Sequence, residues 1–446
     1  MNYRIYRLLY FIAAFGLLLH GRAAGWSEEI RRIPVAEGLA SHPVNGGHCL
    51  ISDGVYQYLA FYDGDHQMTI AKRKLGENQW EFAKLPERVG WDTHNTILMF
   101  LDREGQIHLT GNMHAASLKY YRTKIPGDIQ TFQAIHTWTG KYEDRVTYPT
   151  LLKRHDGSIH LMYRHGGSGA GMRLLIHYSE KDHQWTGTGE GFISGLLTKP
   201  DCNAYPFGGI VEDASGTLHI AWCWRETPDV TTNFNVNYAQ SLDGGYTWRK
   251  WNGEKLALPI QPENAEVVDL IAQKQGLMNG GSLAIDENGI PYIGYTRFDE
   301  NGFNQMYAAT PQGGVWKAVQ LTDWKKQFWF EGRGTIPQYP PIPRISLSPD
   351  GTMNIRYANS TAEPNEGCMI LTREKLLSLK PGECPIQPIA DSSPIVPNIR
   401  AVNDGPLPPG QTHYMQQETD IPNRDRKPDN PRQPTMIYLA EVDKTK

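Results

Sequence analysis

Short apolar segments follow tight turns at six places along the chain, and each either alternates apolar and polar residues or is apolar almost throughout. The segments are VYQYLAFY, QIHLTGN, SIHLMYR, TLHIAWCW, IPYIGYTR and TMNIRYA. Each follows a turn that contains a glycine, namely Gly54, Gly105, Gly157, Gly216, Gly289 and Gly351. Glycine reaches the positive φ angles of tight turns, and apolar runs bounded by turns are typical of β-strands. The pattern therefore predicts a succession of β-hairpins.

These glycines recur at intervals of 51, 52, 59, 73 and 62 residues. A repeat of this size that holds several short strands is typical of a β-propeller blade. Roughly 420 residues at about 60 per blade correspond to seven blades. We expect an all-β protein, a single seven-bladed β-propeller whose blades have four antiparallel strands.

Three further segments bear on how the ring of blades is completed. The last apolar strand, Met436–Val442, is predicted to pair with the N-terminal segment and so to complete the seventh blade. The stretch from Pro381 to Pro434 is rich in Pro, Asn and Asp, which predicts a long surface excursion. Ser241–Trp248, SLDGGYTW, matches the Asp-box, a hairpin turn of sialidase-type propellers whose Trp packs between blades.

The N-terminus has the pattern of a secretory signal peptide. Arg4 and Arg7 precede the apolar run Leu8–Leu19, and small residues follow it. The run is too short to span a bilayer, and no cysteine lies there for lipid attachment. We expect residues 1–24 to be removed and residues 25–446 to form the propeller. The mature protein is then periplasmic or secreted and has no membrane span.

Charge and composition narrow the choice of partners. A formal net charge of -4 argues against a nucleic-acid-binding protein, which would show a basic face. Aromatic residues make up 11% of the chain, which suits stacking on sugars, although large β-structures use aromatics in any case. An odd number of cysteines leaves at least one thiol unpaired and allows one or two disulfides among Cys49, Cys202, Cys223, Cys368 and Cys384.

The stretch from Trp91 to Gly169 holds side chains that bind carboxylates and move protons. Its segments WDTHN, GNMH, TYP and YRHGGSG place candidate residues at or beside strand ends and Gly-rich turns, namely His94, His114, Tyr148 and Arg164. Residues of neighbouring blades can converge on one cleft, because one strand of each blade reaches the axis. Taken singly, each residue also fits a scaffold role with a structural hydrogen bond.

On these four segments the chain resembles a known group, the BNR-repeat seven-bladed propellers that act on uronic-acid polysaccharides. The resemblance covers nearly all of the mature chain. The group includes ulvan-type polysaccharide lyases and the hydrolases that remove L-rhamnose from D-glucuronic acid, glycoside hydrolase family 145. The chain is most similar to the hydrolases.

The similarity to the lyases implies β-elimination. This reaction requires that the uronate carboxylate be neutralised, that a base take the C5 proton and that an acid protonate the departing O4. The set that looks like the lyase constellation consists of His94, His114, Tyr148 and Arg164. Arg333, in the segment GRG before a later strand, is a further arginine able to hold a carboxylate.

The similarity to the hydrolases implies a different site, on the opposite face of the propeller and built around one histidine of the first blade. His48, in the segment NGGHC, stands at that point. An imidazole titrates near neutral pH and can protonate a glycosidic oxygen or activate water. This mechanism departs from the usual pair of carboxylates. Three candidate carboxylates are more simply explained as turn residues: Asp92, Asp144 and Asp243.

We therefore expect an exo-acting glycoside hydrolase that releases terminal L-rhamnose linked α-1,4 to D-glucuronic acid on plant arabinogalactan or gum arabic glycans, with His48 as the catalytic residue. The alternatives are a uronate-specific polysaccharide lyase and a non-catalytic carbohydrate-binding propeller. No cofactor is expected; the resemblance to this group allows a structural metal, but no spacing in the sequence establishes a metal site. A monomer is the default for a closed propeller. Three other histidines are expected to be solvated: His66, His155 and His165.

Overall fold

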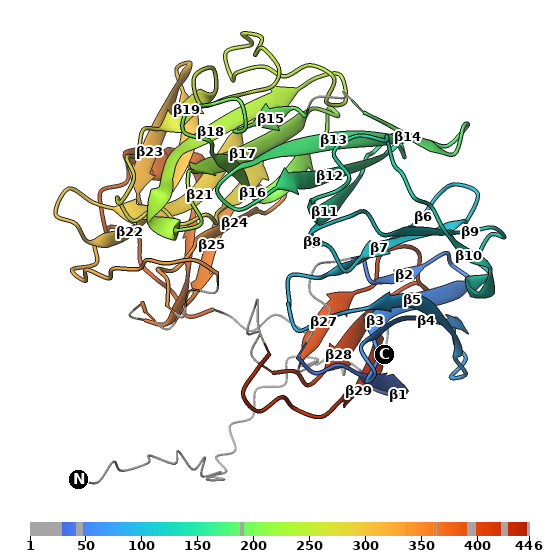
Figure 1. The fold of residues 1–446 in the computed structure, drawn as a ribbon. Helices are drawn as coiled ribbons and strands as arrows, with labels where there is room; N and C mark the ends of the chain where they lie inside the picture. The colour runs from blue at the N-terminus through green and yellow to red at the C-terminus, as the bar shows by residue number, and fades with distance from the viewer. Residues whose placement is uncertain are drawn as a thin grey trace, which may run out of the picture.

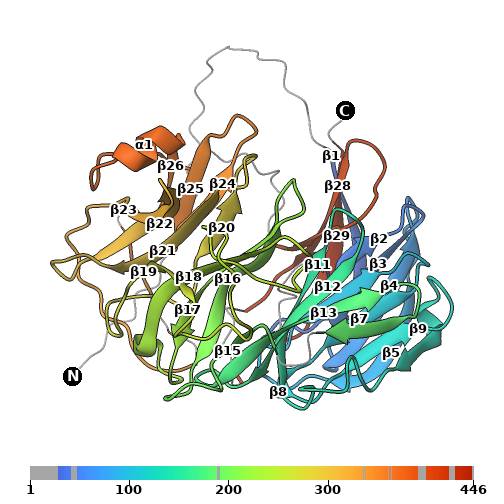
Figure 2. The same cartoon turned by 90° about the horizontal axis from the view of Figure 1, so that it is seen from above.

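The part of the chain that the computed structural model describes consists of strands joined in seven antiparallel sheets, which follow one another around the molecule (Figures 1 and 2). From the first sheet to the sixth, the first strands of successive sheets contact one another and so line the axis. This is the architecture of a β-propeller, and the predicted seven-bladed all-β fold is confirmed. The described residues are 29–41, 48–187, 191–334, 336, 338–359, 361–362, 364–389, 398–420 and 427–443. The expected signal peptide and the turn before His48 lie outside them.

Each blade is one sheet, whose strands are named in their spatial order. The first is β2 (Leu50–Ser52), β3 (Tyr56–Tyr62), β4 (Gln67–Lys74) and β5 (Glu81–Arg88), and the second is β6 (Ile97–Leu101), β7 (Ile107–Gly111), β9 (Tyr120–Thr123) and β10 (Phe132–Ala134). The third is β11 (Val146–Lys153), β12 (Ile159–Gly166), β13 (Gly171–Ser179) and β14 (Gln184–Gly187), extended by β8 (His114–Ala116) and β15 (Ile193–Ser194).

The remaining blades continue the ring. The fourth is β16 (Asn203–Glu212), β17 (Leu218–Arg225), β18 (Asn233–Ser241) and β19 (Glu266–Asp269), and the fifth is β20 (Ser282–Ile285), β21 (Pro291–Phe298), β22 (Asn304–Gln312) and β23 (Val315–Gln320). The sixth has three strands where four were expected: β24 (Arg344–Leu347), β25 (Met353–Ala358) and β26 (Glu366–Leu371), followed by the short helix α1 (Arg373–Ser378).

The seventh blade joins the two ends of the chain. Its strands are β27 (Ile399–Val402), β28 (Gln411–Gln417), β29 (Thr435–Asp443) and β1 (Glu29–Gly38). The predicted pairing of the last strand with the N-terminal segment is confirmed, since Ile33 lies opposite Leu439. The interpretation of Pro381–Pro434 as a surface excursion is wrong in part, because β27 and β28 lie within it and pair with the closing strand.

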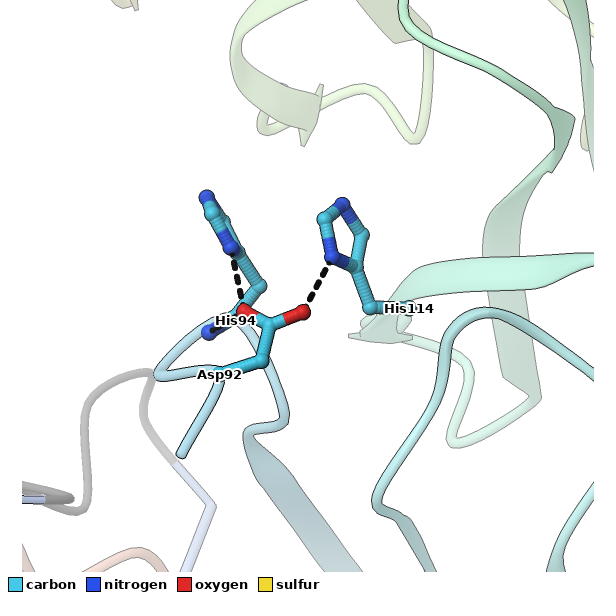
Figure 3. Close-up of side chains that lie close together, drawn as sticks. All are labelled: Asp92, His94 and His114. Atoms are coloured by element: carbon cyan, nitrogen blue, oxygen red, sulfur yellow. Dashed lines mark hydrogen bonds and ion pairs between the residues drawn. The ribbon is translucent and has the colours of Figure 1, made fainter. Parts of the chain in front are cut away.

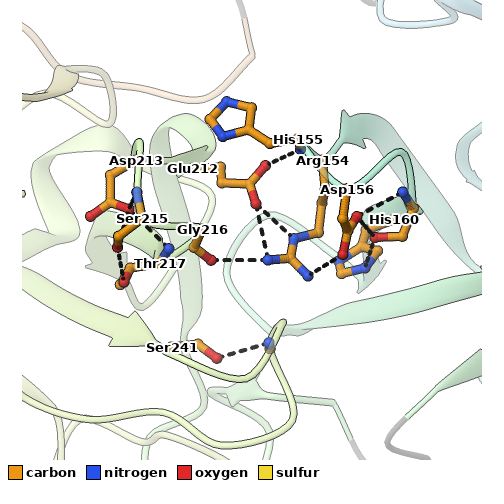
Figure 4. A network of polar contacts seen from close by, with 12 residues as sticks. Arg154, His155, Asp156, His160, Glu212, Asp213, Ser215, Gly216, Thr217 and Ser241 are labelled. Carbon is orange, nitrogen blue, oxygen red and sulfur yellow. Dashed lines mark hydrogen bonds and ion pairs between the residues drawn. The ribbon is translucent and has the colours of Figure 1, made fainter.

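In the second and fourth blades, the turn between the first and second strands is fixed by a buried carboxylate. Asp213 Oδ1 accepts hydrogen bonds from the backbone N–H groups of Ser215 (2.8 Å) and Thr217 (2.9 Å) (Figure 4). Its Oδ2 lies 3.1 Å from His219 Nε2, and His219 Nδ1 lies 2.6 Å from the Tyr238 hydroxyl. The same arrangement occurs in the second blade with Asp102, His108 and Tyr120. Turn and strand are thus joined inside each of these blades.

In the third blade an arginine, Arg154, occupies the place of that aspartate and binds the next blade instead. Its Nε donates to Glu212 Oε1 (3.0 Å) and its Nη2 to the Gly216 carbonyl (2.9 Å), while the N–H of His155 donates to Glu212 Oε2 (2.8 Å) (Figure 4). The Glu212 side chain is nearly buried. The pair therefore ties the turns of the third and fourth blades to each other.

Apolar side chains fill the space between neighbouring blades. One such cluster contains Leu175 of the third blade and Trp222 of the fourth, together with Trp248 of the Asp-box. Trp248 is fully buried and stacks on Phe192 with 5.0 Å between ring centroids. The predicted position of this Trp between blades is confirmed.

All five cysteines are buried and free, so the disulfides that the sequence allows do not form. Burial raises the pKa of the thiols of Cys49, Cys202 and Cys223 to about 12. They therefore act as small apolar core residues. Among the described elements, no helix has the length and apolar character needed to cross a membrane.

The propeller has two faces that matter for the site. We call the turn face the one that carries the turns between first and second strands, where Arg103 Nη2 donates to the Asp156 carbonyl and Arg154 Nη2 to that of Gly216. We call the entry face the opposite one, where the first strands begin and where the second strand of each blade turns into the third. The connection between β12 and β13, residues 167–170, lies on the entry face.

Candidate functional site

Asp92 joins the two histidines that the sequence singles out. It lies in the turn before β6, and its Oδ1 is 2.6 Å from His94 Nδ1 while its Oδ2 is 2.6 Å from His114 Nδ1 (Figure 3). The two imidazole rings lie side by side, with 4.3 Å between their centroids. The second nitrogen of each ring points away from the carboxylate (Figure 3). One carboxylate thus orients both rings.

The charge of Asp92 fixes the tautomers of its partners. Burial opposes ionisation, but the hydrogen bonds from His114 and His94 outweigh it and hold the pKa of this carboxyl well below its ordinary value. An ionised carboxylate only accepts hydrogen bonds, so both Nδ1 atoms carry a proton. In the neutral imidazoles each Nε2 then carries the lone pair that can take a proton.

Tyr148 and Arg164 complete the same cluster from the third blade. The Tyr148 ring centroid lies 5.9 Å from those of both His94 and His114, and the Arg164 guanidinium lies 5.3 Å from the Tyr148 centroid. Tyr148 has a φ of +51°, a conformation that costs free energy for a residue with a side chain and that collects at functional sites. The predicted cluster of four residues therefore exists on the entry face.

Arg164 is a buried cation without a carboxylate partner among the described residues. It is 2% exposed and donates from Nη2 to Thr147 Oγ1 (3.2 Å), while its Nε has no partner there. Burial lowers the pKa of Arg164, and the neighbouring Tyr205 and Tyr148 oppose this. A positive charge in this position can neutralise a substrate carboxylate.

Asp92, His94 and His114 also form a group that could hold a metal ion, since their ligand atoms lie within 4.8 Å of one another. Histidines that bind metals commonly donate their other N–H to a carboxylate, as both do here. Each of the three residues would offer one ligand atom, a nitrogen from each imidazole and an oxygen from the carboxylate. The cluster is therefore suited both to proton transfer and to holding a divalent cation.

His48 lies in a second cluster, which sequence reasoning did not assemble. Its Nδ1 is 3.1 Å from Asp404 Oδ2, and the same oxygen is 2.6 Å from Lys153 Nζ. Each of the three side chains is about one third exposed. His48 has a φ of +62°, and its carbonyl accepts a hydrogen bond from the N–H of Met99 (2.8 Å). The backbone is thus held in a costly conformation at this point too.

Asp404 is the ionised centre of the second cluster. The hydrogen bond from His48 holds the pKa of its carboxyl well below its ordinary value, burial opposes this, and Lys153 adds to the lowering. His48 therefore donates its Nδ1–H, which leaves Nε2 to exchange a proton with a substrate or water. A carboxylate-oriented histidine is suited to general acid–base chemistry.

The two clusters lie toward opposite faces. Tyr148 is near the start of β11 and Lys153 is its last residue. Five residues of extended strand span at most roughly 16 Å, at about 3.3 Å each, and the irregularity between Thr147 and Thr150 shortens this span. Asp404 follows β27 in the turn to β28, which belongs to the turn face. Any reaction at His48 is therefore separate from one at His94 and His114.

The other residues considered from the sequence have more limited contacts. Arg333 is exposed, and no contact connects it to either cluster within the described residues. His155 is exposed as expected. The expectation of solvation is wrong for His66, which is half-buried against Trp91, and for His165, whose Nε2 lies 3.1 Å from Asp144 Oδ1.

Three residues of the two clusters were missed or misinterpreted. Asp92 was explained as a turn residue, and it does accept the N–H of His94 (3.0 Å), but its side chain also binds both imidazoles. Lys153 and Asp404 carry no local signal, because they meet across 251 residues of sequence. Asp243, by contrast, only fixes its turn through Ser241 and Thr247.

Comparison with known proteins agrees with the fold. An ulvan lyase of Pseudoalteromonas sp. (strain PLSV), assigned to PL25, is 23% identical over 361 residues, which cover 70% of this chain and 68% of that protein. An ulvan lyase of Alteromonas sp. (strain LOR) is 24% identical over 307 residues, covering 60% of this chain and 58% of that protein.

Solved structures show the same architecture. The polysaccharide lyase Uly1 superposes with a TM-score of 0.60 at 16% identity, over 93% of this chain and 99% of its own. A PL25 ulvan lyase superposes with a TM-score of 0.50 at 15% identity, over 79% of this chain and all of its own. The model of the family described as "BNR repeat-containing family member" matches residues 56–324, which is more than half of the sequence. The chain therefore belongs to the BNR repeat-containing family.

Proposed function

We propose that the protein is an exo-acting glycoside hydrolase that releases terminal L-rhamnose linked α-1,4 to D-glucuronic acid. The observation that carries the proposal is the cluster of His48, Asp404 and Lys153 on the turn face. It offers one oriented imidazole and one ammonium group. The first can move the proton, and the second can attract the glucuronate carboxylate.

The hydrolysis needs no second catalytic carboxylate in this scheme. The bond between C1 of rhamnose and O4 of glucuronate breaks, a water oxygen bonds to C1, and a proton reaches O4. His48 Nε2 is the group placed to transfer that proton, and Asp404 stabilises the imidazolium that forms when it accepts one. In the complex with the substrate, the glucuronate carboxylate is the second negative group beside Asp404.

A second candidate function, β-elimination from a uronate, is supported by the convergence of His94, His114, Tyr148 and Arg164 and by the similarity to ulvan lyases. Arg164 would neutralise the carboxylate, an imidazole Nε2 would take the C5 proton, and the Tyr148 hydroxyl would protonate O4. The C4–O4 bond breaks and a C4=C5 double bond forms. The product is an unsaturated uronate.

The two reactions give products that one experiment separates. The protein is incubated with gum arabic and with ulvan, and free L-rhamnose and the ultraviolet absorbance of an unsaturated uronate are measured. We expect rhamnose from gum arabic, and we expect His48→Gln to abolish its release while Tyr148→Phe leaves it nearly unchanged. Absorbance that disappears in Tyr148→Phe would assign elimination instead. If neither product forms, the alternative of a non-catalytic carbohydrate-binding propeller stands.

A further inference from the structure

A cavity of about 350 Å³ lies between the fifth and sixth blades, and neither reaction uses it. It is lined in part by Asn304, Trp324, Lys326 and Phe328 from the fifth blade and by Thr361 from the sixth. Its volume falls within the range of small-molecule sites. We call it the inter-blade cavity.

Asn304 gives the inter-blade cavity a polar group without a protein partner. The side chain is 6% exposed, and its Oδ1 accepts a hydrogen bond from the N–H of Phe328 (2.6 Å). Its Nδ2 has no acceptor within the described residues. A buried donor in this state costs folding free energy, which a ligand oxygen would recover. The side chain is fixed at one end and unsatisfied at the other.

Trp324 supplies an aromatic wall. Its ring packs edge-on against Tyr357, with 5.6 Å between centroids, and its backbone N–H donates to Gln305 Oε1 (3.0 Å). The side chain is only half-buried. A fixed indole beside a hydrogen-bond donor suits a ligand with one apolar and one polar side, and a pyranose ring is such a ligand.

The charges around the inter-blade cavity favour an anion. Lys325 Nζ is paired with Asp323 Oδ1 at 2.6 Å, so these two charges balance. Lys326 Nζ donates to the Thr361 carbonyl (3.3 Å), and no carboxylate pairs with it in the described part of the chain. An ammonium group has three donors, so others remain. Within the described residues, Lys326 therefore leaves one positive charge uncompensated, and one such charge matches one carboxylate.

The position of the inter-blade cavity separates it from both clusters. Asn304 is the first residue of β22, and Thr361 lies between β25 and β26. Both connections turn from a second to a third strand and so lie on the entry face. His94, His114, Tyr148 and Arg164 belong to the second and third blades of that face. The His48 side chain instead contacts Asp404, which lies with Lys153 on the turn face.

We propose that the inter-blade cavity binds an acidic sugar unit, a uronate, as a second glycan site away from the reacting one. This proposal rests on the proposed function in one respect only, that the ligand is an acidic glycan. A polymer long enough to pass from the entry face to the turn face could bind at both places, which would raise its effective concentration at the reacting site.

The test uses a matched pair of ligands, methyl β-D-glucuronide and methyl β-D-glucoside, which differ only in the carboxylate. Saturation-transfer NMR on the full protein measures their binding. We expect the glucuronide to bind at least tenfold more tightly than the glucoside, and we expect its affinity to fall about tenfold, or about 1.4 kcal/mol, in Lys326→Gln. Asn304→Asp should have a similar effect, because it keeps the acceptor for Phe328 and removes the donor.

The control is turnover of the disaccharide L-rhamnose-α-1,4-D-glucuronate, which is too small to reach both sites. Turnover should be unchanged in Lys326→Gln and Asn304→Asp, while the KM for gum arabic rises. Unchanged glucuronide affinity in both variants, or equal affinity for the glucoside, would overturn the proposal. Loss of disaccharide turnover in Lys326→Gln would also overturn it, since the cavity would then belong to the reacting site. If the wild-type protein converts no disaccharide, the proposed hydrolysis fails and the binding result still stands.

Discussion

Asp92 has two carboxylate oxygens and uses each for a different imidazole, at 2.6 Å in both cases. Because the carboxylate stays ionised, it can only accept, and both rings must present Nδ1–H to it. The chemistry of His94 and His114 therefore depends on Asp92, which acts through the two imidazoles and does not itself contact the substrate. We regard Asp92 as a positioning residue.

Asp92→Asn should change a tautomer. An amide can accept from one Nδ1–H but presents its NH₂ group to the other ring, which must then carry its proton on Nε2. Nitrogen NMR of labelled histidine should show both rings as Nδ1–H in the wild-type protein and one ring switched in the variant. The rate of any β-elimination should fall by about 10²- to 10⁴-fold, as for loss of a general acid or base.

Asp144→Asn is the matched control for that variant. Asp144 also binds a histidine, His165, at 3.1 Å, but its side chain is 75% exposed and lies outside the cluster. The substitution Asp144→Asn should leave the tautomers of His94 and His114 and the rate of β-elimination unchanged. Equal effects of the two substitutions would contradict the positioning role.

Lys153→Met should lower stability in a pH-dependent way. The pKa of Asp404 is lowered in the folded protein by His48 and further by Lys153. A carboxyl whose pKa is lower in the folded state stabilises it above the unfolded value, near pH 4, and loses that contribution as the pH falls toward the folded value. Urea unfolding from pH 3 to 8 should show a deficit at neutral pH that shrinks below about pH 4. A pH-independent deficit, or the same deficit in Lys153→Arg, would indicate lost packing only.

Four residues of the first cluster were predictable from the sequence, but the role of Asp92 in joining the two histidines was not. His94, His114, Tyr148 and Arg164 stand beside turns and strand ends, so the sequence predicts that they meet, although their roles stay predictions. Asp92 gives the same local signal as any Asp that accepts the N–H two residues later. Its contact with His114 depends on where β8 pairs with β11, which no local pattern encodes.

The strands of six blades follow from their turns, because a turn carboxylate and a buried histidine or tyrosine recur beside several of the apolar runs. Tyr292, for example, donates to Asp286 Oδ2 in the fifth blade. The seventh blade was predicted only at its ends. Its strand β27 has four residues, which is too short for a periodic signal inside a Pro-rich stretch.

The closing strand β1 should carry much of the stability of the ring. Ile33 is 2% exposed and packs in one cluster with Leu50 of the first blade and Leu439 of β29. Ile33→Ala should lower the free energy of unfolding by about 2–5 kcal/mol, as for other truncated core residues. Urea unfolding measures this, with the exposed neighbour Arg32→Ala as the control, expected to stay within about 0.5 kcal/mol of wild type. Equal losses of unfolding free energy in Ile33→Ala and Arg32→Ala would show that burial of the inner face of β1 does not stabilise the ring.

The whole ring places one candidate cluster toward each face, and the strand β11 carries a residue of both. This strand carries Tyr148 at one end and Lys153 at the other, and it is hydrogen-bonded to β12 along most of its length. The shared strand raises the question of whether a change at one face reaches the other. If β11 only holds Tyr148 and Lys153 apart, a substitution in one cluster will have no effect on the other cluster.

Tyr148→Phe and Lys153→Met answer that question as a double-mutant cycle. The two residues are five positions apart on β11, at most roughly 16 Å. Effects of substitutions more than about 10 Å apart add within about 0.3–0.5 kcal/mol. We expect the losses of unfolding free energy in the two single variants to sum to that of the double variant. We also expect Lys153→Met to reduce rhamnose release, while Tyr148→Phe leaves it nearly unchanged. A larger interaction energy would mean that β11 has two arrangements that both faces bias, since coupling over this distance requires a structural element that can switch.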